Sequence, residues 1–133
     1  MASARHLARR SAVQLLYAHE MGCGKPELLM EENKLGEKYK AFALELYGGA
    51  KAYGDQINAR LSAVLPDQWP IERLGCVERA ILRLACYELL FSALDAPVVI
   101  NEAVELAKEL ADDNAPTLIN GILETIRKNR AKA

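Results

Sequence analysis

Hydrophobic residues recur along this chain with the spacing of helices, and Gly and Pro residues divide the pattern into segments. No segment alternates apolar and polar residues over a useful length, so the pattern predicts an all-α helical bundle. About seven helices are expected, at residues 4–21, 26–33, 37–47, 50–65, 75–93, 98–111 and from about 115 onward. The expected stops include Gly48-Gly49, and the last helix opens with a proline in its first turn.

One segment differs from the others because it is apolar on nearly every side. The stretch VERAILRLACYELLF, residues 77–91, carries only four charged residues, which are Glu78, Arg79, Arg83 and Glu88. A helix with this pattern is normally surrounded by other helices. We therefore expect it at the centre of the bundle.

Positive charge gathers on the first predicted helix, although the whole chain has a formal charge of −1. No acidic residue precedes Glu20. On a helical wheel, one arc about 100° wide faces inward; it holds Ala8, Ala12, Leu15, Leu16 and His19. The opposite side holds His6, Arg9, Arg10, Val13, Gln14 and Tyr17, with Arg5 at the margin. The wheel thus predicts an outward surface of cations, an amide and one ring.

Two explanations fit such a surface. Most charged helical faces are simply solvated, but those usually mix charges of both signs. Arginine matches phosphate oxygens, and an exposed ring such as Tyr17 offers a stacking surface for an unpaired base. The residues alone leave single-stranded RNA binding and a solvated face about equally supported.

Sequence motifs for catalysis or metal binding are missing. The three cysteines form no CxxC pair, the two histidines are widely spaced, and there is no P-loop, GxGxxG or GxSxG motif. We expect no enzyme, no metal and no cofactor. Three cysteines cannot all pair, which favours a reducing compartment. The N-terminus has no hydrophobic core of a signal peptide, and charged residues interrupt the apolar residues 80–100, which argues against a membrane span. We therefore expect the protein in the cytoplasm.

Three segments, in this order and spacing, resemble the NusB family of transcription antitermination factors: VERAILRLACYELL, INEAVELAKEL and LINGILETI. The opening SARHLARRSAVQLLYAHEMG is also similar to the start of that family. The resemblance covers nearly the whole chain and is weakest over residues 24–68. It implies one helical RNA-binding domain of two packed subdomains, with helices at about 4–65 and 72–130.

The resemblance also implies a function. NusB-type factors bind boxA, a short single-stranded leader RNA, together with the ribosomal protein NusE. The complex helps RNA polymerase resist termination in ribosomal RNA operons of bacteria. The positions that match the family's RNA contacts are Arg5, His6, Arg9, Arg10, Tyr17 and Glu78, and Gln14 joins them on the same helical face. An acid at Glu78 also favours the helix dipole, which is the structural alternative for this residue.

Contacts with a protein partner are expected at Arg79 and Arg83, on grounds of exposure alone, and at Asn114, where the family often has an acid. Here His6 and Leu7 interrupt the arginine cluster, and residues 115–119 replace a segment that carries a basic residue in the family. A second hypothesis follows: a helical adaptor, or a self-associating dimer, with little RNA affinity. The N-terminal domain of an RNA cytosine methyltransferase is a third and less favoured hypothesis, because no cofactor-binding segment follows in the 133 residues.

Overall fold

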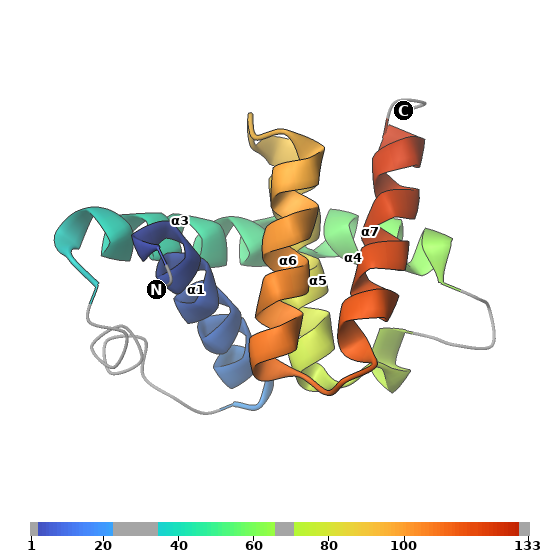
Figure 1. Ribbon diagram of the computed structural model, residues 1–133, viewed down its shortest axis with the longest axis horizontal. Helices are drawn as coiled ribbons and strands as arrows, with labels where there is room; N and C mark the ends of the chain where they lie inside the picture. Colours follow the sequence, from blue (N-terminus) through green and yellow to red (C-terminus); the bar gives the residue numbers. More distant parts are fainter. Residues whose placement is uncertain (1–2, 23–34, 66–70, 131–133) are drawn as a thin grey trace.

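The computed structural model describes residues 3–22, 35–65 and 71–130 (Figure 1). Within these ranges the regular structure is entirely helical, which confirms the predicted all-α class. The elements are α1 (Ala4–Glu20), α3 (Glu37–Ala52), α4 (Gly54–Val64), a short 3-10 helix η1 (Ile71–Arg73), α5 (Cys76–Phe91), α6 (Ala96–Leu110) and α7 (Ala115–Arg130). The helix predicted at residues 26–33 lies outside the described ranges.

Helix α3 passes through the two glycines at which we expected it to stop. It continues to Ala52, and the backbone turns at Tyr53 before α4 begins. The predicted helix at 50–65 is therefore the last turn of α3 followed by α4. The reason is tertiary: the ring of Tyr87 on α5 occupies the space where a side chain at Gly49 would lie. A glycine at this position allows α3 and α5 to approach closely, and packing offsets its low helix propensity.

Helix α5 lies at the centre of the bundle, as its all-apolar pattern predicted. It contacts α1, α3, α4, α6 and α7. Its buried side chains cover most of the helix circumference, and the remaining side holds half-buried residues. The buried residues are Ala80, Ile81, Leu82, Leu84, Ala85, Cys86, Glu88 and Leu89. Glu88 is the one charged member of this set, and its partner is described below.

Helices α6 and α7 stand side by side, and the short turn that joins them lies at one end of both (Figure 1). Proline in the first turn of α6 fits because the first turn of a helix needs no backbone donor there. The carboxylate of Asp112 accepts hydrogen bonds from the backbone N–H groups of Asn114, at 3.0 Å, and Ala115, at 3.1 Å. These bonds fix the turn into α7.

One cluster of buried residues runs through the molecule. It includes Ala12 of α1, Leu46 of α3, Ile57 of α4, Leu106 of α6 and Leu123 of α7. The cluster crosses both predicted halves, 4–65 and 72–130, and their division into subdomains stays a prediction.

Candidate nucleic-acid interface

Helix α1 carries most of the predicted RNA contacts, and its start is well defined. The hydroxyl of Ser3 accepts a hydrogen bond from the backbone N–H of His6 at 3.1 Å and so caps the helix. The first turn contains no acidic residue. The positive end of the helix dipole and the side chain of Arg5 therefore act together at the surface.

Four of the predicted α1 residues reach the surface. Arg5 is exposed, Tyr17 is 38% exposed, and Arg10 and Gln14 are half-buried. For Arg10, Gln14 and Tyr17 the predicted outward orientation is confirmed, and Arg5, which was expected at the margin, is exposed.

Arg9, by contrast, is inside the bundle, and its predicted outward orientation is wrong. It is only 4% exposed, and its guanidinium forms two parallel hydrogen bonds with the carboxylate of Glu88 on α5. Arg9 Nε lies 2.9 Å from Oε1, and Nη2 lies 3.1 Å from Oε2. The guanidinium also lies over the ring of Phe42, 5.4 Å from its centroid. This arginine joins α1, α3 and α5, and its charge is already matched by a buried carboxylate.

His6 is also turned inward, against the prediction. Its ring is held between two carboxylates of α6, with Nδ1 2.9 Å from Glu102 and Nε2 2.6 Å from Glu109. Burial alone lowers the pKa of His6, but the hydrogen bonds and the negative charges of the two glutamates outweigh it, so the pKa is raised. The arrangement favours an imidazolium that donates through both nitrogens.

Two further positions on α1 differ from the wheel. Val13 was expected outside and is 1% exposed, whereas His19 was expected inside and is exposed, with its ring nearly perpendicular to that of Tyr47. The wheel assumed one packing face, but α1 packs against α3 and α5 and is linked to α6 by ion pairs. The exposed arc is consequently narrower than predicted, and it is centred near Arg10 and Gln14.

Arg10 marks the border between this exposed arc and α6. Its Nη1 lies 3.6 Å from Oε2 of Glu109, with the two side chains 31% and 36% exposed. The carboxylate of Glu109 therefore faces both His6 and Arg10. Partly exposed pairs of this length contribute little to stability, so a phosphate can replace the carboxylate at low cost.

Glu78 is far from α1 in the sequence, but it lies near another predicted site residue, Asn114. It is half-buried in the first turn of α5, and with Asn114 it lines an open cavity of about 340 Å³. The other lining residues are Arg73, Leu74, Gly75, Asp112, Ala115 and Leu118. The starts of α5 and α7 thus place a carboxylate and an amide on one surface, where they can contact a base, a ribose or a protein partner.

Arg79 and Arg83 are less exposed than we expected, and their role in partner binding stays a prediction. Both pair with the carboxylate of Glu20 at the end of α1, and Arg79 also donates to the backbone oxygens of Glu72 and Leu74. Their side chains are only 11% and 25% exposed. These arginines hold the ends of α1 and η1 against α5.

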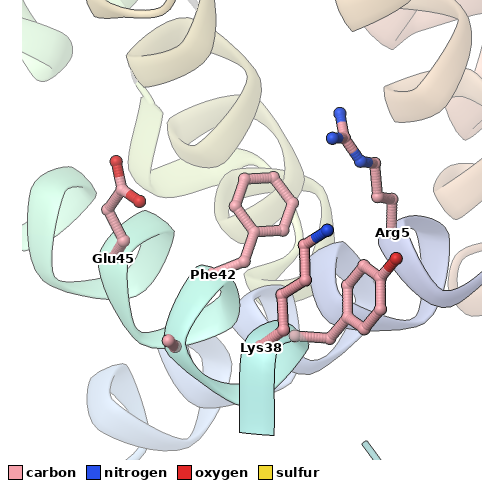
Figure 2. A pocket seen from close by; sticks show the side chains of 6 residues that line it. Arg5, Lys38, Phe42 and Glu45 are labelled. Carbon is pink, nitrogen blue, oxygen red and sulfur yellow. The ribbon is translucent and has the colours of Figure 1, made fainter. Parts of the chain in front are cut away.

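A cavity of about 260 Å³ at the start of α3 was not expected from the sequence (Figure 2). It is lined by Arg5, Lys38, Tyr39, Ala41, Phe42 and Glu45. The signal was present in the run Lys38-Tyr39-Lys40, where a ring stands between two cations. The pairing of Glu88 with Arg9 was also not expected from the sequence. The signal was the position of Glu88 in an apolar helix, because a buried acid needs a partner.

Cys86 is a buried cysteine of the central helix α5. Burial raises the pKa of the Cys86 thiol to about 12, which keeps this thiol protonated and unreactive. Among the residues that the structure describes, no group of three His, Cys, Asp or Glu side chains is placed to hold a metal ion. In the same residues, no helix combines the length and the apolar character needed to cross a membrane.

Comparison with known proteins identifies the family. The NusB family model matches residues 6–128. The chain belongs to the NusB family. It is 45% identical to the transcription antitermination protein NusB of Sulfurimonas denitrificans over 130 residues, which cover 95% of this chain and 98% of that protein. It is also 45% identical to NusB of Campylobacter jejuni over 127 residues, which cover 93% of this chain and 96% of the relative.

Solved NusB structures share the fold. T. maritima NusB superposes with a TM-score of 0.85 at 34% identity, and the match covers 98% of this chain and 95% of the other. A crystal structure of the antitermination factors NusB and NusE in complex with dsRNA gives a TM-score of 0.83 at 30% identity, with 96% and 98% coverage.

Proposed function

We propose that this chain is an RNA-binding transcription antitermination factor. It binds boxA-type single-stranded leader RNA together with the ribosomal protein NusE, and it promotes processive transcription of ribosomal RNA operons. It acts in the bacterial cytoplasm, without catalysis and without a cofactor. The observation that supports this proposal most strongly is the NusB family match over residues 6–128.

The surface of α1 supports the RNA-binding part of the proposal. Arg5 and Arg10 supply cations for phosphates, Gln14 supplies an amide, and Tyr17 supplies a ring for a base or ribose. Arg10 is already partly neutralised by Glu109, so we expect a shallow dependence of binding on salt. Arg9 and His6 contribute by holding α1 in place and not by touching phosphate.

The cavity shared by Glu78 and Asn114 supports a second contact region. Glu78 can accept a hydrogen bond from a base amino group or a 2′-hydroxyl. Asn114 is exposed at the start of α7, and we propose it as a contact for the protein partner.

One observation favours the competing function, a helical adaptor or dimer with little RNA affinity. Of the cationic side chains predicted to bind RNA from α1, His6 and Arg9 are already paired with glutamates of this chain. Each pair neutralises positive charge of α1 that RNA could otherwise contact.

Fluorescence anisotropy with a labelled boxA-type RNA separates these functions. The wild-type protein is titrated with and without NusE at two salt concentrations, and co-elution of the protein with NusE is followed by size-exclusion chromatography. Arg10→Ala should weaken RNA binding. Arg127→Ala is the matched control, because Arg127 is also a partly exposed arginine paired with one glutamate, Glu124. Equal affinities of the two variants would remove Arg10 from the interface, and an absence of RNA binding by the wild type, even with NusE, would favour the adaptor.

A further inference from the structure

The cavity at the start of α3 combines cations and rings at the end of α1. Its six lining residues include Arg5, the exposed cation nearest the start of α1. Lys38 is exposed, and its Nζ lies 5.6 Å from the ring centroid of Tyr39. In Figure 2, Phe42 stands between Arg5 on one side and Glu45 on the other. The cavity therefore has a positive end, aromatic walls and a negative end.

We infer that this cavity receives one unstacked nucleotide of the bound RNA; the inference rests on the proposed RNA-binding function. Arg5 and Lys38 bind the phosphate groups, and the base lies against Tyr39 and Phe42. Base–aromatic stacking combined with cations that follow the backbone is the common mode of single-strand binding. The volume of about 260 Å³ is slightly below the range of about 300–1,000 Å³ for drug-sized ligands, so the cavity suits one small planar group.

Charge distribution favours a nucleotide over a peptide. An acidic peptide would place its carboxylates in the same cavity as Glu45, and the like charges would repel. A nucleotide separates its anionic phosphate from its base, and adenine and cytosine carry amino groups that can donate to the carboxylate of Glu45. The cavity therefore selects a nucleotide with an amino group and disfavours uridine.

Tyr39 gives the most direct test, because it is half-buried and lines the cavity. Phe42 is less suitable, since the buried guanidinium of Arg9 lies over its ring. Binding of labelled boxA-type RNA and of short oligo(A) is measured by anisotropy. Tyr39→Ala should weaken binding of at least one of these RNAs by about five-fold or more, the loss of one stacked base. Tyr53→Ala removes an exposed tyrosine at the end of the same helix, outside the cavity, and should leave both affinities unchanged.

The negative end of the cavity is tested through base preference. The ratio of oligo(A) to oligo(U) affinity should exceed one for the wild type and fall toward one in Glu45→Ala. The ratio cancels the general gain in affinity that follows from removal of a negative charge. Lys38→Ala should reduce the slope of log affinity against log salt by about one.

The outcomes distinguish this inference from the proposed function. If the wild type binds RNA while Tyr39→Ala behaves like Tyr53→Ala on both RNAs, the nucleotide site is wrong and the RNA-binding function stands. If the wild type binds no RNA, the proposed function itself fails. Thermal melting of each variant verifies folding, and Lys38→Ala, at an exposed position, provides a second test if Tyr39→Ala is unstable.

Discussion

The guanidinium of Arg9 and the carboxylate of Glu88 form a two-point ion pair inside the helical bundle, with both side chains no more than 5% exposed. The pair spans 79 residues of sequence and joins α1 to the central helix. It places the most inward cation of α1 beyond the reach of a ligand at the surface. The ion pair determines how any substitution at Arg9 should be interpreted.

Replacement of one partner should damage the fold and not only RNA binding. Arg9→Ala leaves the carboxylate of Glu88 buried without its counter-charge, which costs about 3–5 kcal/mol of unfolding free energy. Replacement of both, as Arg9→Met with Glu88→Leu, should restore most of that loss, because two apolar side chains need no partner. Urea denaturation followed by circular dichroism gives both values. A double variant no more stable than Arg9→Ala would contradict this account.

The free energy of unfolding should fall as pH rises, because His6 loses its proton and with it the ion pairs to Glu102 and Glu109. The folded-state pKa of His6 is raised above its ordinary value of about 6.5 by Glu102 and Glu109, despite the opposing effect of burial. The stabilisation is fully present below about pH 6.5, the unfolded pKa, and is lost as pH increases through the higher folded pKa. Urea midpoints measured from pH 5.5 upward should show this fall in the wild type and a smaller one in His6→Gln. His19→Gln controls for loss of a histidine at an exposed site. Identical profiles for wild type and His6→Gln would exclude the proposed linkage.

Two neighbouring glycines of α3 should respond in opposite directions. Gly48→Ala places its methyl group in open space, so it should stabilise the helix by about 0.5–1 kcal/mol. Gly49→Ala forces the ring of Tyr87 to move and disturbs its contacts with Tyr53 and Phe91, which should cost about 1–3 kcal/mol. Thermal unfolding of the two variants side by side measures the difference. Equal stabilisation by both would mean that α5 does not press on Gly49.

Tyr17 should contribute to RNA affinity through its ring. Tyr17→Ala is expected to lose about 1–3 kcal/mol of binding free energy for a boxA-type RNA, whereas Tyr17→Phe keeps the ring and most of the affinity. Anisotropy at fixed salt measures both variants. Equal losses in the two variants would assign the contribution to the hydroxyl group and not to stacking.

The sequence predicted the helices where local patterns suffice. The apolar run at residues 77–91 identified the central helix, because a helix that is apolar on all sides requires neighbours on all sides. The opening of α7 at Asn114-Ala115-Pro116 also followed from local turn and capping preferences. The end of α3 could not be predicted from local preferences. Gly49 is accommodated in the helix because the ring of Tyr87, 38 positions further along the chain, packs against it.

In the candidate interface, too, some features follow from the sequence and others only from the tertiary structure. The sequence by itself determined the helical class, the central helix and the cationic composition of the first helix, because these depend on residue spacing. Only the tertiary structure decided which cations face solvent. Arg9 turns inward because Glu88, in a distant helix, needs a counter-charge, and His6 does so because Glu102 and Glu109 flank it. A helical wheel describes one helix, whereas the burial of a charge depends on the partner that another helix supplies.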